Sequence, residues 1–183
     1  MTAPAIAPVT LDTAAPAAAD TLRAVKAKIG MIPNLYATLA HSSAALNGLL
    51  AINEALGAGS LSGGEREIVA LATAQVNGCQ YCLSAHTLLG KGAGLKPEQI
   101  AQARMGAGTT PRDAAIAALA RSIAQTRGHD SSNELAAARS AGLSEGDVME
   151  VIVGVAANAL TNFTNNIAGT TVDFPVVAIE VAA

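Results

Sequence analysis

The sequence predicts an all-α protein, and three observations lead to this prediction. No segment alternates apolar and polar residues as a half-buried strand does. The composition is 51% hydrophobic but only 2% aromatic, and a core of small aliphatic side chains lets helix axes approach closely. Typical helix-start and helix-stop residues recur along the chain. A length of 183 residues fits one domain, which we expect over 20–183, after a flexible Ala/Pro-rich arm over 1–19.

The first three expected helices are short and are bounded by glycine, proline and serine. The first covers residues 20–28 and ends at Gly30, because glycine readily adopts the left-handed conformation that closes a helix. A proline can occupy the first turn of the second helix, expected over 33–40. Ser43 can cap the third, which runs to about residue 56.

The fourth helix has the clearest start. Ser62 followed by Glu65 forms an S-x-x-E capping box ahead of an apolar run. This helix ends at Asn77-Gly78, a pair that tolerates the left-handed conformation. Cys79 then lies in the first turn of a fifth helix, expected to reach about residue 93.

Four more helices follow with similar signals. A short one begins after Pro97, and a longer one opens with Thr110-Pro111 and closes at Gly128. Another covers about 132–141. Ser144 with Asp147 caps the last long helix, which runs to about residue 168. The segments "LSGGE" (61–65) and "LSEGD" (143–147) occupy equivalent helix starts, so either an internally duplicated helical unit or a shared capping pattern explains them.

The segment "CQYCLSAH" holds both cysteines of the chain. On a helix, Cys79, Cys82 and His86 fall on one stripe, and the last two are at i and i+4, within reach of a proton transfer. The positive end of the helix also favours a thiolate at Cys79. The helix start therefore favours Cys79 as the attacking sulfur, whereas the nearby imidazole favours Cys82. We predict that Cys82 is the nucleophile.

Glu67 is placed near His86 by helix register. If the chain reverses at residues 77–78 into an antiparallel pair, Glu67 lies about eleven residues before the turn and His86 about eight after it. At 1.5 Å per residue these depths differ by roughly one helical turn. Glu67 can then orient and charge the imidazole, whereas diverging helices would separate the two. Because Glu65 is expected to cap the helix, Glu67 is the better functional candidate.

An inert core and a zinc site are the two other interpretations of the cysteine pair. Cysteine is often a small buried residue, but two cysteines and a histidine on one stripe argue against an inert core. A zinc site would lack an obvious fourth ligand, since His41 and His129 are the only other imidazoles. No metal and no cofactor are expected.

The last long helix carries a second polar feature. Asn158, Asn162 and Asn166 recur at i, i+4 and i+8 on an otherwise apolar helix. Asn162 and Asn166 are taken as candidate substrate-binding residues beside the dithiol, as is Tyr81. The alternative is that the asparagines bond across a subunit interface or face solvent.

The charge and hydropathy of the sequence limit the kinds of partner that the protein can bind. The net charge is −3, and the basic residues are scattered singly, which excludes a nucleic-acid face. No apolar stretch is long enough to span a bilayer, and the N-terminus makes a poor signal peptide. A cytoplasmic location with reduced thiols is therefore expected. The surplus of apolar sequence predicts a homo-oligomer.

The pattern Glu67-x11-Cys79-x2-Cys82-x3-His86 resembles the alkylhydroperoxidase AhpD-like branch of the carboxymuconolactone decarboxylase superfamily. The resemblance is best over about 45–105, and "NALTNFTNNIAGTTVDFP" is similar to its peroxidase-related subgroup. One position departs from the pattern: Tyr81 stands where the best-known peroxidases have a second histidine. True decarboxylases of this superfamily generally lack the cysteine pair.

The resemblance implies an all-α AhpD-like bundle, often trimeric or hexameric, that reduces organic hydroperoxides in an antioxidant role. It implies a cysteine pair assisted by a Glu/His proton relay and regenerated by a lipoyl-type or thioredoxin-like dithiol reductant. Two alternatives stay open. One is a protein disulfide reductase or redox sensor using the same dithiol, and the other is a non-redox lyase using His86 and Glu67 alone.

Overall fold

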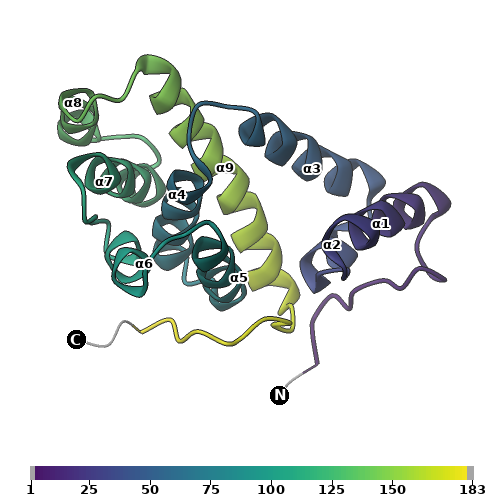
Figure 1. Cartoon of the computed structure of the whole chain (residues 1–183). Helices are drawn as coiled ribbons and strands as arrows, with labels where there is room; N and C mark the ends of the chain where they lie inside the picture. The colour runs from purple at the N-terminus through teal and green to yellow at the C-terminus, as the bar shows by residue number, and fades with distance from the viewer. Residues whose placement is uncertain (1–2, 181–183) are drawn as a thin grey trace.

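The structure is a computed structural model that describes residues 3–180, and these residues form helices without any strand (Figure 1). The all-α prediction is confirmed. In chain order the helices are α1 (Pro16–Ile29), α2 (Asn34–Leu39), α3 (Ser43–Gly57), α4 (Gly63–Val76), α5 (Gln80–Gly92), α6 (Pro97–Arg104), α7 (Pro111–Thr126), α8 (Ser132–Ser140) and α9 (Glu145–Ala168).

Helix α4 lies at the centre of the molecule. It packs against α5, α6, α7 and α9, and its residues 68–74 are all buried. This run is made of alanine, leucine, isoleucine, valine and one threonine, so neighbouring helices can approach it from several sides. The threonine hydroxyl, at Thr73, donates to the carbonyl of Val69 at 2.8 Å, so this polar group is satisfied inside the core.

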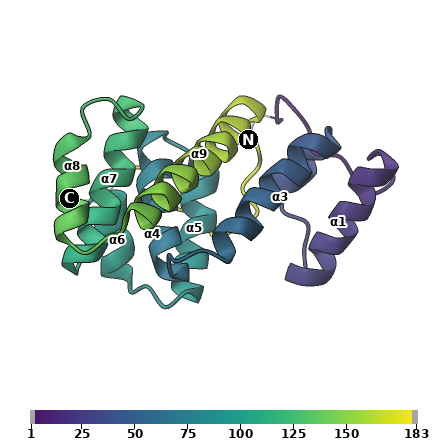
Figure 2. The same cartoon turned by 90° about the horizontal axis from the view of Figure 1, so that it is seen from above.

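Helices α1, α2 and α3 form a smaller layer on the far side of α9 from α7 and α8 (Figure 2). The long helix α9 crosses between this layer and the main bundle, and it contacts α2, α3, α4 and α5. Both sets of helices therefore share α9 as a wall, and this arrangement creates the space in which the cysteine pair lies.

Both ends of the described chain lie along the helices. In the N-terminal segment, the Ile6 amide donates to the Ala168 carbonyl and the Val9 amide to the Ala37 carbonyl, each at 3.2 Å. The C-terminal segment runs beneath α5 and α6 (Figure 1), where the Val177 amide donates to Ser84 Oγ at 3.0 Å.

Three expected boundaries are corrected by the structure. Helix α1 begins at Pro16, inside the expected arm over 1–19, because proline fits the first helical position and Ala18 and Ala19 are buried in the core. Ser42 caps α3 in place of Ser43. Cys79 is the N-cap of α5 and not part of its first turn.

The two matching helix starts are both capping boxes. In each, the serine oxygen accepts from the third amide of the helix, and the acidic side chain accepts from the serine amide. The helices differ in length, with 14 residues in α4 and 24 in α9. Internal duplication stays a prediction, since capping chemistry alone produces this likeness. Among the described residues, no helix is both long and apolar enough to cross a membrane.

Candidate active site

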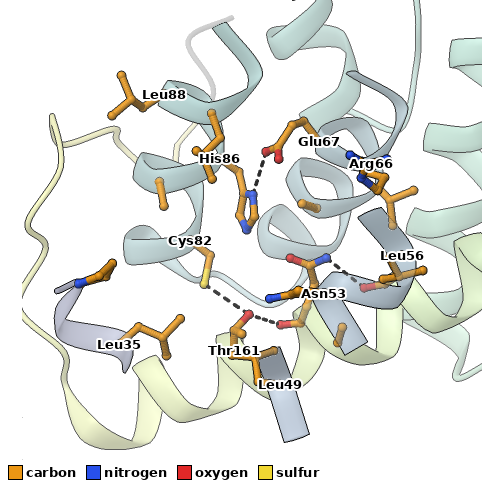
Figure 3. Close-up of a pocket in the computed structure, with 18 of the residues that line it drawn as sticks. Leu35, Leu49, Asn53, Leu56, Arg66, Glu67, Cys82, His86, Leu88 and Thr161 are labelled. Atoms are coloured by element: carbon orange, nitrogen blue, oxygen red, sulfur yellow. Dashed lines mark hydrogen bonds and ion pairs between the residues drawn. The ribbon is translucent and has the colours of Figure 1, made fainter. Parts of the chain in front are cut away.

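The α4–α5 turn brings Glu67 and His86 together. The chain reverses at Asn77 and Gly78, and Gly78 has a φ of 59°, which favours glycine. One oxygen of Glu67 lies 2.8 Å from Nδ1 of His86 (Figure 3). This is the contact that an antiparallel register predicts. Both side chains are partly buried, so water screens the pair less than it would at the surface.

The two sulfurs are adjacent at the start of α5. Cys79 caps the helix, and its Sγ accepts from the Cys82 amide at 3.3 Å. The Sγ atoms of Cys79 and Cys82 are 2.7 Å apart, and both cysteines are free thiols. Their side chains are 0% and 1% exposed respectively, so any reagent must reach them through the interior of the protein.

Helix α9 supplies the polar groups around Cys82. Nδ2 of Asn165 donates to Cys82 Sγ at 3.2 Å, and Thr161 Oγ1 lies 4.0 Å from the same sulfur. Oδ1 of Asn165 is buried without a hydrogen-bond partner in the described residues. The amide is therefore held where it can stabilise negative charge on Cys82, even though its own oxygen is unsatisfied.

The two thiols have opposite acidities. The hydrogen bond from Cys79 lowers the pKa of Cys82 to about 6 against the opposing effect of burial, and the charge of His86 and the amide of Asn165 also lower it. The same hydrogen bond, together with burial, raises the pKa of Cys79. One proton is thus kept on Cys79 while Cys82 is the thiolate, which is the nucleophilic form.

His86 favours its charged form. Burial acts to lower its pKa, but the carboxylate of Glu67 outweighs this and raises the pKa above the ordinary histidine value. Within the described residues no hydrogen bond joins His86 to either sulfur. Figure 3 shows the imidazole between Glu67 and the part of the pocket that holds Cys82. The charged ring is therefore placed to interact with a molecule bound in the pocket.

A cavity of about 500 Å³ adjoins the dithiol. Cys82, His86, Glu67 and Thr161 all line it, together with many aliphatic side chains contributed by α3, α4 and α5 (Figure 3). A volume of this size accommodates a small organic molecule. Its walls are mainly apolar, with a smaller number of polar side chains from α3, α4, α5 and α9.

Tyr81 also lines this cavity and is buried. Its hydroxyl accepts from the Leu35 amide at 3.2 Å, and its ring meets Phe174 edge to face with centroids 5.5 Å apart. Burial raises the pKa of Tyr81, so the hydroxyl stays protonated. Tyr81 joins α2, α5 and the C-terminal segment at the wall of the site.

The structure places Asn162 and Asn166 outside the lining of the cavity, although Asn162 is fully buried near Cys82 and its side chain also lowers the pKa of that thiol. Neither lines the cavity as described; Oδ1 of Asn162 accepts from Nδ2 of Asn77 at 2.8 Å, and Nδ2 of Asn166 donates to the Asn77 carbonyl at 2.9 Å. Both hold α9 against the α4–α5 turn. Positions spaced by four drift about 40° around a helix at each step, so the stripe that begins at Asn158 turns away from the cavity.

The residues that the sequence analysis missed are Thr161, Asn165 and Phe174. Counted from Asn158, the positions facing the sulfur are i+3 and i+7, which follow one helix face more closely than i+4 and i+8. This spacing was visible in the sequence. The approach of Phe174 to Tyr81 had no local signal, because the C-terminal segment folds back over α5.

In the part of the chain that the structure describes, no group of three or more His, Cys, Asp or Glu side chains is arranged to hold a metal ion. The groups that the site brings together are a polarised dithiol and an imidazole–carboxylate pair beside a mainly apolar cavity.

Comparison with known proteins identifies a related family and related folds. Residues 43–125 match the model of the carboxymuconolactone decarboxylase family, and this span holds the cysteines, His86 and Glu67. A search of curated proteins gives no match. An uncharacterized peroxidase-related protein with an alkylhydroperoxidase AhpD core, from Ralstonia eutropha JMP134, is 25% identical with a TM-score of 0.83, covering 94% of each chain.

Two further solved structures share the fold. A peroxidase-related protein from Silicibacter sp. TM1040 is 21% identical with a TM-score of 0.79, covering 93% of this chain and 94% of its own. The debrominase Bmp8, in apo form and as a variant bound to 2,3,4-tribromopyrrole, is 14–15% identical with a TM-score of 0.77, covering 92% and 91%. This fold therefore carries more than one activity.

Proposed function

The chain belongs to the carboxymuconolactone decarboxylase family and has the AhpD-like fold, and from this premise we propose that it is a thiol-dependent peroxidase that reduces organic hydroperoxides. The observation that carries the proposal is the polarised pair of sulfurs: Cys82, with a pKa lowered to about 6, receives a hydrogen bond from Cys79 at 2.7 Å beside the cavity. This pair supplies a nucleophile and a resolving thiol at one place.

The first step is attack of the Cys82 thiolate on the distal oxygen of the hydroperoxide. The O–O bond breaks, Cys82 becomes a sulfenic acid, and the leaving alkoxide takes a proton to become an alcohol. His86 is the proton donor, because Glu67 stabilises its charged form. The amide of Asn165 stabilises the thiolate before attack.

The second step uses Cys79. Its thiol condenses with the sulfenic acid of Cys82, forming a disulfide and releasing water. An external dithiol then reduces the disulfide by exchange and is itself oxidised. The buried sulfurs favour a lipoyl-type reductant, whose slender arm can enter the cavity, over a thioredoxin-like protein, which presents its cysteines on a surface.

Tyr81 does not supply the second base that a histidine at this position would provide. A phenol whose pKa is raised by burial cannot replace a histidine as a base at neutral pH. We infer that the proton relay runs through His86 and Glu67 alone, and that Tyr81 acts as a substrate-contacting wall of the cavity.

The proposal is tested by the intact mass of fully reduced protein before and after one equivalent of cumene hydroperoxide. We expect loss of two hydrogens per chain within seconds and no such loss in Cys82→Ser. In Cys79→Ser, a sulfenic acid trapped by dimedone should appear on Cys82. A dimedone adduct on Cys79 in Cys82→Ser would mean that the roles of the two sulfurs are reversed. An unchanged mass in the wild type would contradict the proposed peroxidase function.

The same variants separate the two alternatives. A disulfide reductase or redox sensor would exchange disulfides with proteins while turning over peroxides poorly, which the burial of both sulfurs disfavours. A non-redox lyase acting through His86 and Glu67 would keep its activity when both cysteines are replaced by serine.

A further inference from the structure

Arg66 is the free cationic donor of the cavity wall. It lies in the first turns of α4 and lines the cavity. Its Nη1 donates to the Leu61 carbonyl at 2.6 Å, and no ion pair of Arg66 is found among the described residues, in contrast to Arg112, which pairs with Glu65. A guanidinium has five N–H donors, so most of its binding capacity is unused.

The two carboxylates that also line the cavity are already engaged. Glu67 is paired with His86. The oxygens of Glu150 accept from the amides of Ser60 and Leu61 and from the Ser60 hydroxyl, at 2.8–3.0 Å. An anion entering the cavity would therefore find Arg66 unpaired and both carboxylates held by donors of their own.

Arg66 and Cys82 lie at opposite ends of the cavity. Arg66 is twelve residues before Gly78 and Cys82 is four residues after it, so along the paired helices their backbones are separated by eight residues, or about 12 Å. The side chain of a helical residue leans toward the helix N-terminus, which carries the guanidinium further from the sulfur. Figure 3 shows Arg66 next to Glu67, away from Cys82 and Thr161.

The space between these ends is mainly apolar. Leu49 and Leu56 from α3, with Val69 and Ala70 from α4, line it, and Asn53 of α3 adds one amide. A ligand that spans the cavity must therefore have an apolar middle, a group that reacts with a thiolate at one end, and a group that accepts hydrogen bonds from a guanidinium at the other.

We propose that Arg66 binds a carboxylate and that the substrates of this site are hydroperoxides of medium-chain carboxylic acids. The acyl chain lies along the leucines, the carboxylate pairs with Arg66, and the hydroperoxide reaches Cys82. The inference rests on the proposed peroxidase function. The chemistry is unchanged: Cys82 takes the distal oxygen, the proximal oxygen leaves as the alcohol of a hydroxy acid with a proton from His86, and the carboxylate is not consumed.

Binding of unreactive probes tests the subsite independently of catalysis. By calorimetry on the reduced full-length protein, we expect decanoate to bind the wild type and to bind Arg66→Gln at least about tenfold more weakly, because a charge-assisted pair is lost. Methyl decanoate should bind both proteins alike. Arg66→Lys should keep part of the preference, and Arg23→Gln, which alters an exposed arginine on α1, should keep all of it.

Three results would overturn the proposal. They are equal affinity of the wild type for decanoate and its methyl ester, decanoate binding that Arg66→Gln leaves unchanged, and an equal loss of both probes in that variant, which would mean that Arg66 does not distinguish a carboxylate from its ester. In steady-state assays, Arg66→Gln should raise KM for a hydroperoxy acid but not for its methyl ester, with kcat preserved. Failure of the peroxidase itself would appear separately, as the absence of a disulfide after cumene hydroperoxide.

Discussion

At the scale of single residues, the site depends on which polar atoms contact Cys82. Cys79 donates to its sulfur from the N-cap of α5, and Asn165 donates from α9. Both contacts favour the charged form of a sulfur that burial alone would keep neutral. The identity of the nucleophile is therefore set by neighbours that are three and 83 positions away in the chain.

This environment predicts a specific pH dependence. Because the pKa of Cys82 is about 6, its alkylation by iodoacetamide should rise as the pH rises through about 6 and level off above that. Asn165→Leu removes the donated hydrogen bond, so the midpoint should move up by about one pH unit. Peptide mapping of the alkylated protein measures the reaction at each cysteine.

Asn166→Leu is the matched control, since Asn166 donates to the Asn77 carbonyl and not to a sulfur. An equal shift in both variants would mean that the position of α9, and not the Asn165 amide, sets the acidity of Cys82. If the alkylation of Cys82 in the wild type had its midpoint near the ordinary cysteine pKa, the proposed polarisation of the two thiols would be contradicted.

At the scale of elements, the sequence predicted the helices well because their boundaries are local. Ser62 and Ser144 satisfy amides within one turn, so the signal lies in a few adjacent residues. The predicted start of α1, at residue 20, was wrong because the N-cap residue Ala15 makes no side-chain hydrogen bond that would mark the true start. That helix is fixed by burial of Ala18 and Leu22 against the rest of the core, which no local pattern reveals.

Asp147 links the start of α9 to two other segments, and its loss should destabilise the fold. It accepts from the Ser144 amide at 2.9 Å, from the Ser60 hydroxyl and from Arg112. Asp147→Ala should lower the free energy of unfolding by about 1–3 kcal/mol, measured by urea denaturation at neutral pH. Glu145→Ala, in the same turn but pairing only with exposed Arg139, should have little effect.

The pH dependence of this contribution has a definite sign. The Ser60 hydroxyl and the Ser144 amide lower the pKa of Asp147 to about 2. A lowered carboxyl pKa stabilises the folded state above the unfolded pKa, and this contribution is lost as the pH falls toward 2. The difference between wild type and Asp147→Ala should therefore shrink in acid; a constant difference would assign the effect to packing alone.

At the scale of the whole molecule, the outer face of α9 presents a continuous exposed apolar stripe in the described chain. Phe163 is 54% exposed and Ile167 71%, and no charged residue occurs between Glu150 and Asp173. The stripe follows the four-and-three spacing of a helix–helix seam: Met149, Val153, Ala156, Leu160, Phe163 and Ile167. We expect a second copy of the chain to cover it.

This expectation is tested by light scattering after size exclusion. The wild type should have the mass of a homo-oligomer, a trimer or hexamer if it follows the resemblance to its family. Phe163→Glu should reduce that mass, because a charge would be buried in the contact. Ala136→Glu on α8, also at an exposed position, should not. A monomeric wild type would contradict the prediction, and unchanged assembly of Phe163→Glu would place the contact elsewhere.

The sequence by itself determined most helix boundaries and the family resemblance, because each depends on residues close in the chain. It also predicted the pairing of Glu67 with His86 on condition that α4 and α5 run antiparallel, which the structure supplies. Only the tertiary structure decided that Asn165 and Thr161 contact the thiol, while Asn162 and Asn166 bond to Asn77 at the α4–α5 turn. It also decided that Arg66 lines the same cavity. These facts depend on the rotation of α9 and α4 about their axes, which is set by packing against several helices at once.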